Sequence, residues 1–559
     1  MTVKLITFRL LLAWVFAIPV NFFVMGYLGN FYSSPVEIIP VTFLSQLVVG
    51  IFLYHLLNRI GQLIRIRCDD FVFALILFII LFSFIFAMVG TAIRFPSLFD
   101  AGYFLLAGRQ VLFFAIGVLT ALPCLPWTIS IAKQKGISQT RFFKVVDENL
   151  PGLILTAFFF SVYFIFVSIF NRPVFDVDDI FFDSDGLLWR LRFTTGNWQD
   201  YYWRSVHPFV LLIIRPLITF ISFFLKGDRL SAAFVLIAMM GASCVFLTWY
   251  FVKRLNSNAV YALLIASILG GSAAHLVFSS LIETYIFLAA VQILFFVLLI
   301  PPSKALDAGD GAGNKSLFAY VLVGLVTIGI TLTNFIQSAI AFIVVKRDIK
   351  QWFKYCLLVV LLAFPLALLN NFIYPNANPY FFDLSSLNAE ADNTFRPSVD
   401  RALALARVMG FHSVVAPDPL ILQEEIPFRK VWIFKADPLR VSEYNTPLGL
   451  VTAFFWSMLL ILGGYLFLKN LRKEADLISI ALILIILFNF ALHLRYGKDV
   501  FLYSTNWTYA FVLFLALVWK ELSNKRWFQT LLLVFLVLLL VNNSRLIFTM
   551  LSTSALHIK

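Results

Sequence analysis

Residues 71–90 read FVFALILFIILFSFIFAMVG, a run of twenty residues without a charged side chain. A helix that crosses the hydrocarbon core of a bilayer needs about 20 apolar residues. Similar runs recur along the chain, whose 559 residues are 61% hydrophobic and only 13% charged. About 25% of the residues of a typical soluble domain are charged. The sequence therefore predicts an all-α integral membrane protein.

The apolar runs predict about 13–16 transmembrane helices, together with external juxtamembrane helices and two large external loops. The first run follows Lys4 and Arg9 and lacks a small-residue cleavage site, so we expect an uncleaved first helix. The candidate spans are residues 10–28, 40–58, 71–90, 111–129, 151–170, 230–252, 259–278, 284–300, 317–333, 335–345, 355–372, 448–468, 477–493, 507–519 and 527–548.

Loop charges predict the sidedness of these spans. With the N-terminus in the cytoplasm, the predicted inner loops are basic, as at Arg59, Arg65 and Arg67, whereas the outer loop at 29–39 has no Lys or Arg. Basic residues concentrate in cytoplasmic loops of membrane proteins. The net charge of +13 is spread over such loops, so we expect no nucleic-acid partner.

Two apolar stretches must be exceptions to this topology. Residues 209–225 carry Arg215 and Pro216 in their middle, so we expect a helix along the outer interface or a re-entrant segment. Residues 317–345 are expected to form two short helices with a break at 331–334.

The predicted topology divides the chain into four regions. They are 1–150, of unclear role; 151–372, a membrane core with external loop 171–208; 373–447, an external loop or small cap; and 448–559, with external loop 494–506. Residues 303–315 are expected to be a flexible linker.

The first external loop holds the densest set of reactive side chains. Residues 175–209 read FDVDDIFFDSDGLLWRLRFTTGNWQDYYWRSVHPF and begin with five aspartates within ten residues. A carboxylate at the membrane surface suits a base that activates a hydroxyl, and nearby cations suit a leaving phosphate. Aromatic faces suit sugar rings. The plain alternative is a solvated loop with interfacial aromatic residues. Asp183 and Asp185 could also hold a divalent metal, for which a lone Asp-x-Asp is weak evidence.

The stretch DSDGLLWRLRFTTGNW (183–198), followed by SVHPF (205–209), resembles the first external loop of the multispanning glycosyltransferases of the C superfamily (GT-C). That superfamily includes protein mannosyltransferases and the lipid A aminoarabinose transferase. The resemblance implies that Asp185 or Asp183 is the catalytic base, that Trp198 ends the Gly-x-Trp element, and that His207 begins the His-Pro element. Gly186 stands where these enzymes usually have an acidic neighbour, and four extra helices precede the one that leads into the loop.

Two more segments supply candidate site residues. Glu283 is predicted at the outer end of a helix, where an ionisable group is a functional candidate. The stretch HLRYGKDVFLYSTNW (493–507) is predicted outside and carries Arg495, Tyr496 and Lys498. In the C superfamily, basic residues of a late external loop bind the donor phosphate, which the resemblance implies for Arg495 and Lys498. The alternatives are an interfacial glutamate and a short charged turn.

These features predict an inverting glycosyltransferase that moves a sugar from a polyprenyl-phosphate donor to an envelope glycan, a lipid or a protein. We expect it in the bilayer of a bacterial inner membrane, with the site on the external face. A divalent metal is a possible cofactor. The alternatives are a polytopic transporter or lipid flippase, and a glycan polymerase or ligase. A transporter predicts charges at mid-membrane and two related halves, whereas few mid-helix charges apart from Arg215 and no halves are evident.

Overall fold

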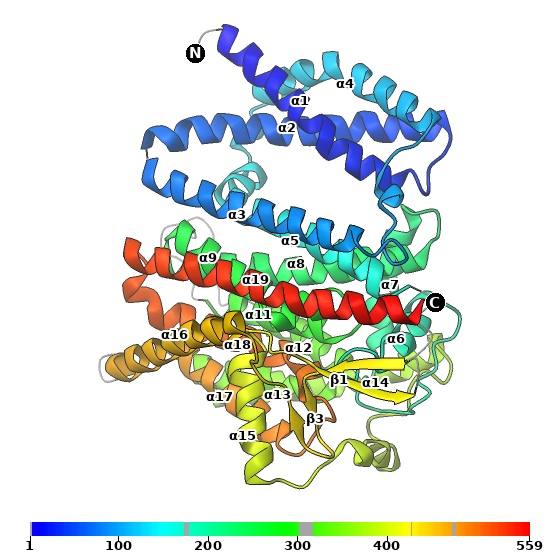
Figure 1. Ribbon diagram of the computed structural model, residues 1–559, viewed down its shortest axis with the longest axis vertical. Coiled ribbons are helices and arrows are strands. Elements are labelled where there is room, and N and C mark those ends of the chain that lie inside the picture. Colours follow the sequence, from blue (N-terminus) through cyan, green and yellow to red (C-terminus); the bar gives the residue numbers. More distant parts are fainter. Residues whose placement is uncertain are drawn as a thin grey trace. The chain divides into compact units, whose positions relative to one another are not determined.

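The computed structural model describes residues 3–66, 68–172, 178–300, 317–425, 428–471 and 477–558. Asp176 and the expected linker at 303–315 lie outside these ranges. Within them, nine helices are long and apolar enough to cross a membrane, and six shorter apolar helices of 10–17 residues accompany them. The prediction of a helical membrane protein is confirmed. Two compact units are distinguished, residues 1–79 with 92–150 and residues 80–91 with 151–559 (Figure 1).

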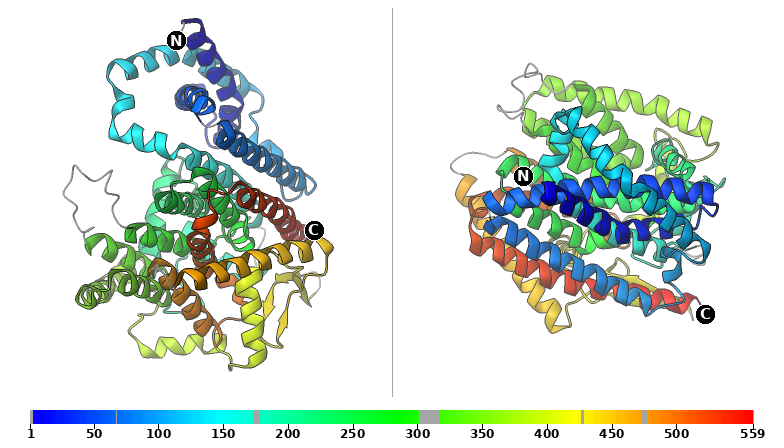
Figure 2. Two further views of the ribbon diagram at one scale, coloured as in Figure 1. Left: turned by 90° about the vertical axis from the view of Figure 1, so that its left-hand side faces the viewer. Right: turned by 90° about the horizontal axis from the view of Figure 1, so that it is seen from above.

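In the first unit, α1, α2 and α4 pack side by side (Figure 2). Asn21 of α1 donates a buried hydrogen bond to Gln46 of α2 over 3.1 Å. Gly117 of α4 lies against Thr42, where a Cβ would come within 2.7 Å of the threonine Cβ. Small residues and interhelical hydrogen bonds hold helices together where lipid weakens the hydrophobic effect. The elements begin with α1 Val3–Leu28, α2 Pro35–Ile66, α3 Cys68–Ile93, η1 Ala101–Phe104, α4 Arg109–Gln134, η2 Ile137–Gln139 and α5 Arg141–Phe170, of which α3 and α5 continue into the second unit.

The second unit contains most of the chain. Its helices are α6 Gly186–Thr194, α7 Val210–Phe223, α8 Arg229–Asn256, α9 Ala259–Gly271, α10 Ala273–Phe278, α11 Tyr285–Leu299, α12 Leu317–Ile330, η3 Leu332–Asn334, α13 Phe335–Lys346, α14 Ile349–Ile373, η4 Leu384–Asn393, α15 Val399–Arg407, the single π-turn η5 Val408–His412, α16 Pro447–Leu471, α17 Leu477–His493, η6 Val500–Tyr503, α18 Thr505–Val518, η7 Trp519–Leu522 and α19 Arg526–His557. Each of the fifteen candidate spans overlaps at least one of the helices described here, but the span at 259–278 is divided into α9 and α10 at Ser272.

Neither stretch expected to depart from a plain spanning helix forms one long helix, and the placement of residues 209–225 relative to the bilayer stays a prediction. The stretch with Arg215 and Pro216 is α7, a helix of 14 residues. The stretch at 317–345 is divided into α12 and α13 by the single turn η3. The break carries polar groups, since Asn334 and Gln337 are buried there. Gln337 donates to Asn489 of α17 over 3.3 Å, which agrees with the bonding between helices that such polar residues favour.

The second large loop, between α14 and α16, is an ordered cap that is not wholly helical. Besides η4, α15 and η5, it forms two short antiparallel hairpins, β1 Leu420–Glu425 with β2 Phe428–Trp432, and β3 Phe434–Lys435 with β4 Arg440–Val441. Strand β2 packs against α19, visible in Figure 1 as a yellow arrow beside the red helix. The cap is therefore fastened to a membrane helix.

One buried side chain of α19 forms several of the hydrogen bonds that hold the cap to this helix. Asn543 of α19 donates from its Nδ2 to the carbonyls of Gly271 and Val414, each over 2.8 Å. Its Oδ1 accepts from the backbone N–H of Ala416, also over 2.8 Å. Asn543 thus joins α19, the end of α9 and the cap. It bonds the Gly271 carbonyl and the Ala416 N–H, whereas the Val414 carbonyl also accepts from the N–H of Ala273 over 2.9 Å.

We predict that Asn543→Leu lowers the free energy of unfolding in detergent by about 2 kcal/mol or more, because it leaves the Gly271 carbonyl and the Ala416 N–H without this partner, and each buried backbone group left unpaired costs about 1–3 kcal/mol. Denaturant unfolding of the purified protein measures the loss. Val541→Leu is the matched control on the same helix, since Val541 is 51% exposed. Equal losses in the two variants would contradict the role given to Asn543.

Candidate active site

A cavity of about 580 Å³ lies within the second unit. One wall comes from residues 178–185 before α6, here called the aspartate loop, and another from the segment before α7. The others come from the break between α12 and α13, the cap helix η4, and the chain from the end of α17 to the start of α18. Five residues singled out from the sequence line it: Asp183, Asp185, His207, Tyr496 and Lys498. Three others, Glu283, Arg495 and Trp198, are not among its lining residues.

The aspartate loop is a tight turn held by the cap. Phe182 and Asp183 have φ angles of 56° and 61°, a left-handed conformation that is costly for residues with a Cβ. Two backbone hydrogen bonds to Val431 of β2 support the turn, one donated by Phe182 and one accepted by Ile180, each over 2.8 Å. The turn brings Asp183 and Asp185 to the cavity wall.

Asp178, on the other side of the turn, has a structural role. Its carboxylate accepts from two backbone N–H groups at the start of α6, over 2.9 and 3.3 Å, and from the hydroxyls of Tyr201 and Tyr202. An acidic group is favoured at a helix N-terminus. Burial and the neighbouring Asp185 raise the pKa of Asp178 to about 6. Asp178 therefore fixes the start of α6 and does not line the cavity.

Asp185 is held by a buried arginine. Its Oδ2 lies 2.9 Å from Nη2 of Arg204, which also faces Asp200 with Nε 3.7 Å from Oδ2. Asp200 in turn lies 3.4 Å from Nη1 of Arg192. Burial lowers the pKa of Arg192 to about 10 and raises the pKa of Asp200. The alternating charges compensate one another, which buried ions require.

Asp183 has a different environment. Its side chain is half-buried in the cavity wall, and none of the ion pairs described in this structure fixes its carboxylate. Burial, together with the nearby Asp179 and Asp185, raises the pKa of Asp183 well above its usual value, and Lys498 opposes that rise. A carboxylate that holds a proton more tightly than usual is better suited to accept one from a hydroxyl.

Glu283 lies behind the aspartate loop. It is fully buried, and its Oε1 accepts from the backbone N–H of Asp185 over 2.7 Å while Oε2 accepts from Thr284 over 3.1 Å. Burial and the proximity of Asp185 raise the pKa of Glu283. This residue, predicted to bind substrate, is placed where it positions Asp185.

His207 is neutral and anchored. Its Nδ1 lies 2.6 Å from the carbonyl of Ile330, so Nδ1 carries the hydrogen. The ring packs edge-on against Trp189 at 4.9 Å. Burial and the charge of Arg204 lower the pKa of His207 to about 3. A neutral imidazole cannot neutralise a phosphate. His207 instead joins the segment before α7 to the end of α12 and to Trp189 of α6.

The late loop, residues 494–506, places Tyr496 and Lys498 in the cavity lining. A single arginine holds the backbone at the start of this loop. Arg401 of α15 donates from Nε to the carbonyl of Leu494 over 2.9 Å, and from Nη2 to those of His493, Tyr496 and Gly497 over 3.0 to 3.3 Å. Burial lowers the pKa of Arg401 to about 10. Arg401 therefore fixes the backbone conformation of residues 493–497 and does not line the cavity itself.

Trp198 and Arg495 lie away from the cavity lining. The indole of Trp198 donates to the carbonyl of Pro375 over 2.9 Å and lies under Arg215, whose guanidinium is 5.7 Å from the ring centroid. Trp198 thus packs against the chain that follows α14. The side chain of Arg495 is exposed.

Sequence reasoning assigned no role to four further cavity residues, Arg204, Glu390, His493 and Asn506. Arg204 is one of several cations within the quoted aspartate-rich stretch, and the sequence does not distinguish it from the others. His493 and Asn506 border the late loop. Glu390 comes from the cap, and nothing in its local sequence marks it.

The aspartates do not form a metal-ligand set with their neighbours. Across the described ranges, no three His, Cys, Asp or Glu side chains are grouped as metal ligands. The carboxylate of Asp185 is already engaged by Arg204. The residues at this wall therefore do not fit the divalent metal considered for Asp183 and Asp185.

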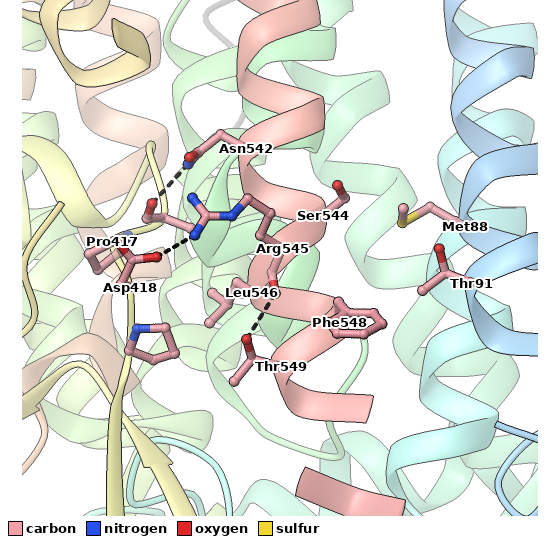
Figure 3. Close-up of a pocket in the computed structure, with 12 residues that line it drawn as sticks. Met88, Thr91, Pro417, Asp418, Asn542, Ser544, Arg545, Leu546, Phe548 and Thr549 are labelled. Carbon is pink, nitrogen blue, oxygen red and sulfur yellow. Dashed lines mark hydrogen bonds and ion pairs between the residues drawn. The ribbon is translucent and has the colours of Figure 1, made fainter. Parts of the chain in front are cut away.

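A second cavity, of about 350 Å³, lies beside Arg545 of α19. Figure 3 shows the Arg545 guanidinium directed at Asp418. Nη2 of Arg545 lies 2.5 Å from Oδ1 of Asp418. Arg545 also donates to the hydroxyl of Thr446. Its charge is compensated, and this cavity contains none of the residues predicted from the sequence.

Comparison with known proteins does not assign a family. No protein-family model, no curated protein and no solved structure matches this chain.

We predict that Arg401→Lys increases amide hydrogen exchange across residues 494–499 by about 10-fold or more. A lysine ammonium cannot reproduce the planar fork that holds four carbonyls, and each tenfold change corresponds to about 1.4 kcal/mol of opening free energy. Mass-spectrometric exchange measures the change. Arg396→Lys, at an exposed position of the same cap, is the control. Unchanged protection in the Arg401 variant would contradict this role.

Proposed function

We propose that this protein is a membrane glycosyltransferase that moves a sugar from a polyprenyl-phosphate donor to an acceptor hydroxyl on the external face. The observation that carries the proposal is a single cavity whose lining includes the carboxylates of Asp183 and Asp185 and the cations of Arg204 and Lys498. A proton acceptor and a phosphate-binding group are both required by the reaction. The resemblance of residues 183–209 to the first external loop of the C superfamily points to the same chemistry.

Asp183 is the better candidate for the base. It accepts the proton of the acceptor hydroxyl while that oxygen forms a bond to the anomeric carbon of the donor. The bond from this carbon to the phosphate oxygen breaks, and its electron pair stays on the phosphate. One displacement of this kind inverts the anomeric centre. The raised pKa of Asp183 supports this role, because a carboxylate with a higher pKa is a stronger base toward a hydroxyl.

Arg204 is the candidate for the leaving phosphate. It is ion-paired with Asp185 and Asp200, yet within the described chain its Nε and Nη2 make no well-directed hydrogen bond. A guanidinium offers a fork of donors that matches phosphate oxygens. Lys498, whose side chain is exposed in the lining, adds a second positive charge. Arg204 takes the place for which the sequence favoured Arg495.

Asp185 is proposed to hold Arg204 in position, and Glu283 is proposed to hold Asp185.

The proposed acceptor is an envelope glycan, a lipid or a protein. The enzyme acts in the bacterial inner membrane with its N-terminus in the cytoplasm. Basic inner loops support this orientation.

We predict that Asp183→Asn lowers donor turnover about 10²- to 10⁴-fold, the usual contribution of a general base. Release of polyprenyl phosphate from polyprenyl-phosphate sugars measures turnover. In the unchanged protein, kcat/KM should fall on acidification, starting well above the usual range of aspartate titration, because the raised pKa of Asp183 leaves it protonated there. The residual activity of Asp183→Asn should lack this acidic limb.

Asp400→Asn is the control, since Asp400 is exposed in the cap and lies outside the cavity. Asp185→Asn should also lose activity, because it releases Arg204. Full turnover in both Asp183→Asn and Asp185→Asn would refute the proposed site.

We predict that cysteines introduced at Asn197 and Asn524 report opposite sides of the membrane. Asn197 is exposed after α6, and Asn524 is exposed between η7 and α19. In a cysteine-free background and intact spheroplasts, a membrane-impermeant maleimide should label Asn197→Cys and should spare Asn524→Cys until the membrane is opened. The reverse pattern would place the cavity on the cytoplasmic side and defeat the proposal.

A further inference from the structure

Three buried hydrogen-bond acceptors line the cavity without a partner in the described chain: Glu390 Oε1, His493 Nε2 and Asn506 Oδ1. The three residues are 8%, 1% and 4% exposed. An unpaired buried polar group costs about 1–3 kcal/mol. Three such groups in one cavity indicate a polar ligand that supplies hydrogen-bond donors.

The bonds that these residues do make establish two of them as acceptors. The Oε2 of Glu390 accepts from the Tyr496 hydroxyl over 2.5 Å and from Asn393 Nδ2 over 3.2 Å, which leaves Oε1. His493 Nδ1 lies 3.2 Å from the carbonyl of Tyr496, so Nδ1 carries the hydrogen. In a neutral imidazole the other nitrogen, Nε2, then has a free lone pair.

Aromatic rings stand beside these acceptors. Tyr503 lies 4.6 Å from the ring of His493, 5.2 Å from Tyr285 and 5.6 Å from Tyr496, measured between centroids. The three tyrosines line the cavity with the acceptors. A sugar ring has hydroxyl donors around its rim and apolar C–H faces, and this wall matches both parts.

We infer that Glu390, His493 and Asn506 form the subsite for the sugar of the lipid-linked donor, with Arg204 binding its phosphate. This inference rests on the proposed function and deepens it. The carboxylate and the two other acceptors take hydrogen bonds from the sugar hydroxyls, and the tyrosines contact the ring. The sugar is thus recognised partly by the cap, because Glu390 belongs to η4.

The test compares the binding of decaprenyl phosphate with that of decaprenyl phosphate carrying glucose, mannose, galactose or arabinofuranose. Thermophoresis of the full-length protein in detergent micelles gives each Kd. The unchanged protein should bind at least one sugar-bearing lipid about 10-fold more tightly than decaprenyl phosphate. Glu390→Gln replaces the free acceptor by a donor, so it should remove most of this preference and leave the Kd of decaprenyl phosphate within about twofold.

Asn506 provides an independent pair of variants. Asn506→Leu removes the acceptor and should reduce the preference, whereas Asn506→Asp keeps an acceptor and should retain it. Glu443→Gln is the matched control for Glu390, since Glu443 is an exposed glutamate of the same cap that lies outside the cavity.

Several outcomes would overturn the subsite. One is a Glu390→Gln variant that keeps the full preference, as expected if water occupies these acceptors. Another is equal weakening for the sugar-bearing and sugar-free lipids, which would assign Glu390 to phosphate binding or to folding. If the unchanged protein consumes a sugar-bearing lipid while Glu390→Gln and Asn506→Leu keep their preference, the subsite alone fails. If it binds none of the decaprenyl lipids, the proposed function fails as well.

Discussion

A backbone N–H or C=O that leaves a helix within a bilayer finds no water, so irregular chain is tolerated there only against protein or a wet cavity. The breaks around the cavity follow this constraint. At η3, Leu332 donates to the carbonyl of Val206 over 2.9 Å. Between α10 and α11, Asn171 accepts from Ile282 over 2.8 Å and donates to Ser280 over 3.0 Å. At each break, backbone groups that leave a helix are hydrogen-bonded by a group from another segment. The conformation of each break therefore depends on the segment that packs against it.

The same requirement applies to charge. Arg192, Asp200, Arg204 and Asp185 alternate in sign, and the members nearer the interior are more deeply buried than those at the cavity. Removing one member would leave its neighbour uncompensated, which costs more than the pair contributes. The network therefore keeps Arg204 charged in a site that excludes most solvent, where its attraction for an anion is strongest.

Apolar runs sufficed to predict the helical membrane fold and the positions of the helices, because spanning length and hydropathy are local properties of the chain. Asp183, Asp185 and His207 were also found locally, since they stand in one short loop beside the cavity. Glu390 could not be found in this way, because only folding brings the cap to the cavity. His493 and Asn506 stand within the quoted stretch 493–507, but their local sequence does not show that both face one cavity. Trp198 looked like a site residue because an exposed aromatic side chain and one that packs against a neighbouring loop have the same local sequence.

The pairing of Phe182 and Ile180 with Val431 has a consequence for biosynthesis. The ribosome delivers the aspartate turn long before it delivers the strand that supports it, so the turn lacks these two hydrogen bonds while the middle helices are being inserted. The cavity is completed only when the chain has been made as far as Asn506. The nascent protein therefore carries an unassembled site through most of its synthesis, and a chain truncated within the cap would enter the membrane without one.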